Sequence, residues 1–142
     1  MPLWKIYHPV NAFSDVDKKG IAQAITSVYQ NFMPRFYVGV TFQEVSESNI
    51  YIGGEPHSEF IRISIDHIAR TFQSVDLKIT FFNRINTLLE PWIESRGYDW
   101  EMHVDETPFD LWTIQGHFPP QEGTPDERRW MEENRASART HA

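Results

Sequence analysis

The sequence predicts an α+β fold, close to α/β, made of tandem β-α-β units and a C-terminal tail. A strand, a helix and a second strand follow one another twice along the chain. The helix start Ser14–Lys18 (SDVDK) also returns as Ser74–Lys78 (SVDLK) about sixty positions later, which indicates a duplication. Because parallel strands need a right-handed helical crossover, the two units predict a four-stranded, mostly parallel sheet with two long helices on one face.

The first unit begins with an alternating strand over Leu3–His8, which Pro9 ends because proline cannot donate to a sheet ladder. Ser14 is the expected N-cap of the first helix, and Pro34 stops that helix. The apolar face of this helix consists of Val16, Ile21, Ala24, Ile25, Val28 and Phe32, at three- and four-residue intervals. The β-branched and aromatic residues of Tyr37–Val45 predict the second strand.

The second unit repeats this plan after a turn at Gly53–Gly54. Residues Phe60–Asp66 predict a strand with one apolar and one polar face. Ser74 is the expected N-cap of the second helix, and Gly97 is its expected terminator. The apolar face of that helix consists of Val75, Leu77, Phe81, Phe82, Ile85, Leu88, Leu89 and Trp92. Residues Tyr98–Val104 supply the fourth strand.

The residues after the second unit predict a C-terminal arm with two short helices. The first starts at Thr107–Asp110 and ends near Gly116, and the second starts at Thr124–Pro125 and continues through Met131. The mixed charges of Glu127–Glu133 predict a solvated helix face. Apolar residues are too many for a free tail, so we expect the arm to pack on its own domain or on another subunit: Phe109, Leu111, Trp112, Ile114, Phe118 and Trp130.

The length and composition predict one acidic domain. Its 142 residues suit a single domain, with a first repeat at about 2–58, a second at about 59–106 and the arm at about 107–142. The net charge of -7 argues against nucleic acid and acidic membranes as partners. The absence of cysteine excludes disulfides and thiolate nucleophiles. Without a signal-peptide pattern or an apolar run of ~20 residues, we expect a cytoplasmic protein that is not in a membrane.

Pro2 is the first candidate for chemistry. Removal of Met1 would leave Pro2 with a free secondary amine, which can take and return protons. An α-amino group titrates near about 7.7–8, and burial beside a cation lowers its pKa further. The alternative is that Pro2 only begins a strand, and with Met1 retained its nitrogen is an amide that cannot act as a base.

Arg70 is the second candidate, in the segment between the third strand and the helix that Ser74 opens. An arginine at the mouth of a helix N-terminus can bind a carboxylate or enolate through two donors. The alternative is an ordinary surface ion pair of Arg70 with Asp66 or Asp76. We expect the nearby His67 to be a hydrogen-bonded structural histidine.

His103 is the third candidate, near the end of the fourth strand. Strand alternation places His103 on one face with Glu101 and Asp105, where its ring could donate a proton or polarise a carbonyl. Glu106 is expected to support the following turn. No recurring metal-ligand spacing is present, so we expect no metal site.

Short segments in a fixed order carry a resemblance to a known family: Pro2 with its strand, Ala24-Ile25-Thr26, Phe42-Gln43-Glu44, Gly53-Gly54, Asp76-Leu77-Lys78, Glu106 with Pro108, and Gly116 through Pro120. Together they resemble the tautomerase superfamily over nearly the whole chain, and within it the cis-3-chloroacrylic acid dehalogenase-like group. The segments Trp4–Pro9 and His103–Pro108 look like its uncharacterised fungal branch.

The resemblance implies a homotrimeric enzyme that uses no cofactor. Pro2 matches the catalytic proline, and Arg70 matches the first of two arginines that hold the substrate carboxylate. The remaining site positions differ from the dehalogenase. Gln73 stands where the dehalogenase has its second arginine, and Tyr29 stands where it has a histidine. His103 stands where it has a tyrosine, and Ile114 stands where it has the glutamate that activates water. Without that glutamate, true dehalogenase activity is not expected.

The expected function is therefore tautomerisation or isomerisation of a small carbonyl–enol substrate, including one that carries a carboxylate. Pro2 moves the proton, Arg70 and His103 complete the catalytic set, and Tyr29 and Gln73 bind the substrate. One alternative is a lyase, hydratase or dehalogenase-like enzyme that acts on an unsaturated acid. The other is a non-catalytic structural or binding homologue.

Overall fold

One four-stranded sheet forms the centre of the protein. The computed structural model describes residues 1–140 and contains strands β1 (Pro2–Pro9), β2 (Gly39–Val45), β5 (Phe60–Ile68) and β6 (Asp99–Thr107), in the order β2-β1-β5-β6. The pairs β1–β2 and β5–β6 are parallel, whereas the central pair β1–β5 is antiparallel. The two predicted β-α-β units are therefore present, and they join through their first strands into a mixed sheet.

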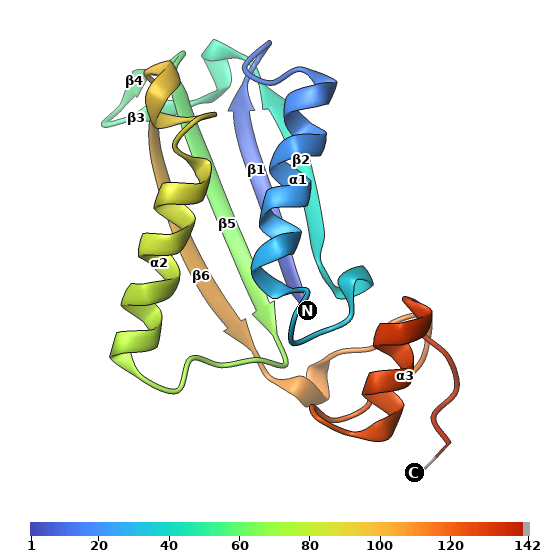
Figure 1. Ribbon diagram of the computed structural model, residues 1–142. Helices are drawn as coiled ribbons and strands as arrows, with labels where there is room; N and C mark the ends of the chain where they lie inside the picture. Colours follow the sequence, from blue (N-terminus) through green and yellow to red (C-terminus); the bar gives the residue numbers. More distant parts are fainter. Residues whose placement is uncertain (141–142) are drawn as a thin grey trace.

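Helices α1 (Asp15–Tyr29) and α2 (Val75–Leu89) cover the same face of this sheet (Figure 1). Both predicted N-caps are confirmed: the hydroxyl of Ser14 accepts the Asp17 amide at 3.1 Å, and that of Ser74 accepts the Leu77 amide at 3.1 Å. Asp17 also accepts the Ser14 amide at 3.0 Å, which completes a capping box. The repeated sequence thus starts both helices with a serine N-cap, and α1 has the capping box in addition.

The predicted ends of these helices were wrong. The first helix ends at Tyr29 rather than near Phe32, and the second ends at Leu89 rather than at Gly97. Gly97 instead ends a separate 3-10 helix, Glu94–Arg96, where its φ of +83° suits glycine. The apolar periodicity also extends beyond the buried stripe: Val16, Val75 and Leu77 are exposed, at 82%, 68% and 51%.

The core lies between the helices and the sheet. Alternate residues of β5, Ile61, Ile63 and Ile65, are fully buried, as are Ile25 of α1 and Ile85 of α2. Strand alternation therefore points the even-numbered residues between them at the uncovered face.

Short elements connect the main ones. The chain enters β2 through a 3-10 helix, Arg35–Tyr37, so the strand starts two residues later than expected. The turn at Gly53–Gly54 joins a hairpin of β3 (Tyr51–Ile52) and β4 (Glu55–Pro56). Two further 3-10 helices span Glu47–Asn49 and Phe109–Leu111.

The C-terminal arm packs at the end of the sheet where β1 begins (Figure 1). Its only α-helix among the described residues is α3 (Pro125–Glu133), which starts at the predicted cap Thr124. Trp130 of α3 is fully buried and contacts the rings of Phe36 and Tyr37 at centroid distances of 5.9 and 6.3 Å. The arm thus packs on its own domain. The predicted arm extends to residue 142, and its residues 141–142 lie outside the described part of the chain.

No helix within residues 1–140 has the length and apolar character that crossing a membrane requires.

Candidate functional site

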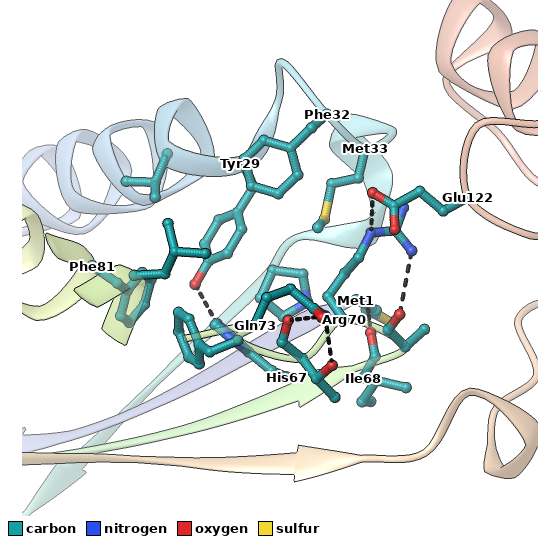
Figure 2. Close-up of a pocket in the computed structure, with 16 residues that line it drawn as sticks. Met1, Tyr29, Phe32, Met33, His67, Ile68, Arg70, Gln73, Phe81 and Glu122 are labelled. Carbon is teal, nitrogen blue, oxygen red and sulfur yellow. Dashed lines mark hydrogen bonds and ion pairs between the residues drawn. The ribbon is translucent and has the colours of Figure 1, made fainter. Parts of the chain in front are cut away.

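A cavity of about 380 Å³ opens where β1 begins, β5 ends and the two helices meet the sheet (Figure 2). Its walls combine backbone and side chains from all of these elements and one residue of the arm. The lining includes Met1, Pro2, Tyr29, His67, Arg70, Gln73 and Glu122. Four of the five predicted site residues therefore share one cavity.

The antiparallel pairing of β1 and β5 creates this meeting point. Pro2 at the start of β1 lies opposite His67 at the end of β5, so the N-terminus and the segment before α2 share one end of the sheet. Ala69 then adopts a left-handed φ of +69°, and its amide donates to the Thr107 carbonyl at 3.1 Å. A positive φ is uncommon for alanine, and such conformations concentrate at functional sites.

The N-terminal amine lies at this cavity. Pro2 is buried, and the Met1 amine donates a hydrogen bond to the Ile68 carbonyl. Burial, and then the positive charge of Arg70, lower the pKa of this amine from 8.0 to about 5, against an opposing effect of Glu127. The Met1 amine is therefore largely neutral at physiological pH.

Arg70 points into the cavity and is held by the arm. Its Nη2 donates to Glu127 Oε2 at 2.8 Å, and its Nε lies 3.4 Å from Glu122 Oε1. The expected alternative partner Asp66 instead pairs with Lys5 at 3.3 Å. The prediction that Arg70 lies before α2 is confirmed, but its partners come from the arm rather than from its own neighbourhood.

Glu127 also corrects the expectation of a fully solvated face on the last helix. Its side chain is 5% exposed, and its Oε1 accepts the Gly123 amide at 3.1 Å. A buried carboxylate requires a cationic partner, and Arg70 fills that role here.

A chain of buried hydrogen bonds crosses the cavity wall from Trp4 to Tyr29 to His67. The indole Nε1 of Trp4 lies 3.2 Å from the Tyr29 hydroxyl, which lies 2.8 Å from His67 Nε2. An indole N–H can only donate, so the hydroxyl accepts from Trp4 and directs its own hydrogen to His67. Burial also raises the pKa of Tyr29, so the hydroxyl keeps this hydrogen.

His67 is therefore a neutral ring with its proton on Nδ1. Burial, and then the N-terminal charge, lower its pKa from 6.5 to about 4. Nδ1 makes no hydrogen bond to the part of the chain that the structure describes, which leaves a free N–H donor on a ring that lines the cavity. The expectation of a hydrogen-bonded histidine is confirmed, but its place in the site was missed. Its alternation with Ile63 and Ile65, which puts it on the helix side of β5, was the available signal.

Gln73 lies on the segment between β5 and α2. Its side-chain amide donates to the carbonyl and the hydroxyl of Thr71, both at 3.2 Å. Glu106 accepts the Phe72 amide at 2.9 Å, so it supports this segment. These contacts hold the cavity wall that carries Arg70.

His103 is the predicted site residue that the structure does not bring to this cavity. It lies opposite Ser64 in the β5–β6 pairing, on the face that the helices leave uncovered. Its Nδ1 lies 2.6 Å from Arg62 Nη2, and its Nε2 lies 3.2 Å from Asp105 Oδ2. Within one chain, His103 belongs to this polar cluster on the other side of the sheet.

The cavity thus combines a desolvated amine, a cation, a neutral imidazole donor and aromatic walls. This set suits proton transfer on a small polar molecule with an oxygen that gains negative charge. Within residues 1–140, no three histidine or acidic side chains are grouped to hold a metal ion.

Comparisons with known proteins agree with this architecture. Residues 1–135 match the Tautomerase_3 family, described as "Putative oxalocrotonate tautomerase enzyme". The chain is 41% identical to RhCC from Rhodococcus jostii RHA1, with a TM-score of 0.94 over 96% of this chain and 99% of that one. It is 42% identical to AU4130, described as a probable enzyme from the thermophilic fungus Aspergillus fumigatus, with a TM-score of 0.92 and 97% of each chain covered.

A more distant structure, N1 of the cis-3-chloroacrylic acid dehalogenase family, shares the fold at 18% identity. Its TM-score is 0.73, over 92% of this chain and 96% of that one. No curated protein matches the sequence. The family match and the two relatives above 40% identity both span nearly the whole described chain. This chain belongs to the Tautomerase_3 family of the tautomerase superfamily.

Proposed function

We propose that the protein is a cofactor-independent tautomerase or isomerase that moves a proton on a small carbonyl–enol substrate. The observation that carries this proposal is the position of the N-terminal amine. The Met1 amine lies at a cavity, near Arg70, where burial and the neighbouring cation lower its pKa to about 5, and we expect the Pro2 amine, one residue further on in the same cavity, to meet the same surroundings. A neutral amine in such a place is ready to accept a proton from carbon.

Pro2 takes the role of base once Met1 has been removed. Its secondary amine would then begin the chain at a buried position on the cavity wall. The amine takes the proton from the carbon next to the carbonyl and returns it to the other end of the enol system. Proton removal and proton return balance, so no cofactor is consumed.

The other residues hold the substrate while the proton moves. Arg70 binds an anionic oxygen, and the free Nδ1–H of His67 donates to the carbonyl oxygen as it becomes enolic. Tyr29 fixes the His67 ring, and Gln73 borders the same space. Because His103 lies on the opposite face of the sheet, we assign the polarising role to His67 instead.

Hydration or dehalogenation of an unsaturated acid is less well supported. Such a reaction needs a carboxylate to activate water, and Ile114 is not among the cavity residues. The carboxylate that does line the cavity, Glu122, is paired with Arg70.

We also propose that the protein is a homotrimer. A fused 4-OT protein, whose TM-score to this chain is 0.64, was solved as a symmetric trimer. In the described part of a single chain, β2 and β6 form open edges of the sheet and its second face carries no helix. Open edges favour pairing with another chain.

Turnover of an enol tests the reaction directly. Purified protein, with removal of Met1 verified by mass spectrometry, is mixed with the enol form of phenylpyruvate, and the loss of enol absorbance is followed. Ketonisation that is faster than in buffer, in proportion to protein concentration, is expected. A rate equal to that in buffer contradicts the proposal for this class of substrate.

A further inference from the structure

Arg70 faces two carboxylates of different character, both supplied by the C-terminal arm. Glu127 is 5% exposed and accepts a hydrogen bond from Arg70 Nη2 at 2.8 Å. Glu122 is 62% exposed, lines the cavity and lies 3.4 Å from Arg70 Nε. Figure 2 shows Glu122 beside the Arg70 guanidinium, at the edge of the space that a substrate would enter. Glu127 is thus a buried partner of Arg70, whereas Glu122 is an exposed partner that lines the cavity.

The contact with Glu122 leaves a donor of Arg70 unsatisfied. The Nε–H of Arg70 is buried and makes no hydrogen bond within residues 1–140, because the 3.4 Å ion pair lacks hydrogen-bond geometry. A buried N–H without an acceptor is unfavourable, and a better-placed carboxylate oxygen would remove that cost. The guanidinium is therefore prepared for an anion that fits it better than Glu122 does.

We propose that Glu122 determines substrate specificity by occupying the anion position at Arg70 until a substrate carboxylate displaces it. The inference rests on the proposed function, since it concerns the same cavity. Displacement is feasible because Glu122 is exposed and reaches Arg70 through an ion pair of 3.4 Å that lacks hydrogen-bond geometry. Glu127 stays in place, because moving a buried carboxylate from its cation is costly.

The charge balance then selects the class of substrate. Arg70 carries one positive charge, and Glu127 already neutralises it within the fold. A single substrate carboxylate replaces Glu122 one for one, so the local charge does not change. A second carboxylate would find the neutral Gln73 beside the cavity instead of another cation. The site therefore favours monocarboxylates over dicarboxylates.

Binding of a matched pair of ligands tests this inference without any turnover. Isothermal titration calorimetry compares cinnamate with cinnamamide, which has a similar shape but no charge, in wild type, Glu122→Gln and Glu132→Gln. Glu132 is an exposed carboxylate of α3 outside the cavity, so its variant makes the same change in charge at a distance. Cinnamamide reports whether the cavity remains intact.

Glu122→Gln is expected to bind cinnamate about two- to fivefold more tightly than wild type, with unchanged binding of cinnamamide. Glu132→Gln is expected to change neither affinity. Equal or weaker cinnamate binding by Glu122→Gln, or no cinnamate binding by any of the proteins, overturns the inference. A change in cinnamate affinity without enol turnover would contradict the proposed reaction and leave the role of Glu122 supported.

Discussion

The hydroxyl of Tyr29 lies 2.8 Å from Nε2 of His67, so the end of α1 and the end of β5 meet in a buried hydrogen bond at the cavity. The same hydroxyl accepts from Trp4 at 3.2 Å. One oxygen therefore satisfies a buried indole N–H and fixes the tautomer of the histidine.

Tyr29→Phe is expected to lower the free energy of unfolding by about 1–3 kcal/mol, because it leaves the Trp4 N–H and His67 Nε2 without partners. Urea denaturation followed by tryptophan fluorescence measures this change. Tyr51→Phe is the control, since Tyr51 is 57% exposed and its hydroxyl makes no hydrogen bond to any described residue. Equal stability of Tyr29→Phe and wild type would show that the hydrogen-bond chain contributes nothing.

Stability is expected to fall as the pH drops from about 6.5 to about 4. The pKa of His67 is lowered to about 4 by folding, so the unfolded state binds more protons than the folded state in this window. This histidine contributes stability that is complete above pH 6.5, with a slope of at most about 1.4 kcal/mol per pH unit. In protein that keeps Met1, the Met1 amine adds the same sign of slope between about pH 8 and 5.

Denaturation curves at several pH values separate the two groups. His67→Gln is expected to flatten the dependence between pH 4 and 6.5 while leaving the dependence at higher pH. An unchanged slope in His67→Gln would mean that His67 titrates in the folded protein much as it does in the unfolded chain.

Local signals in the sequence were sufficient to predict the main elements. Ser14 and Ser74 mark both helix starts, because a side-chain cap acts within one turn. Alternation of isoleucines identified β5 and its buried face. The ends of the helices were predicted less well, since the apolar pattern continues past Tyr29 and Leu89, where the backbone leaves the helix.

The candidate site was predictable only where its residues are close in sequence or match the family pattern. Pro2 and Arg70 were proposed in that way, and both line the cavity. The pairing of Arg70 with Glu127 spans 57 residues, and a mixed-charge helix gives no sign that one of its carboxylates is buried. His103 was misplaced relative to the cavity because strand alternation shows which residues share a face but not which face the helices cover.

Arg70→Ala is expected to destabilise the fold by about 3–5 kcal/mol, because it leaves the buried Glu127 carboxylate without its cation. The double variant Arg70→Met with Glu127→Leu removes both charges and is expected to regain most of that loss. Urea denaturation of the wild type and both variants checks this. A double variant as unstable as Arg70→Ala would contradict the view that the unpaired carboxylate is the cause.

Light scattering is expected to give a mass three times the 16.7 kDa of one chain. The open edges β2 and β6 and the uncovered polar face of the sheet, including the Arg62–His103 contact, are the surfaces that we expect other subunits to cover. A mass of one chain at all concentrations tested would contradict the trimer.

The most direct test of the central claim compares initial rates of enol ketonisation by wild type and Pro2→Ala, with removal of Met1 confirmed by mass spectrometry in both proteins. If the amine of Pro2 carries the proton, Pro2→Ala should be slower by about a hundredfold or more at unchanged stability. Equal rates for the two proteins would contradict the role of Pro2 and with it the proposed mechanism.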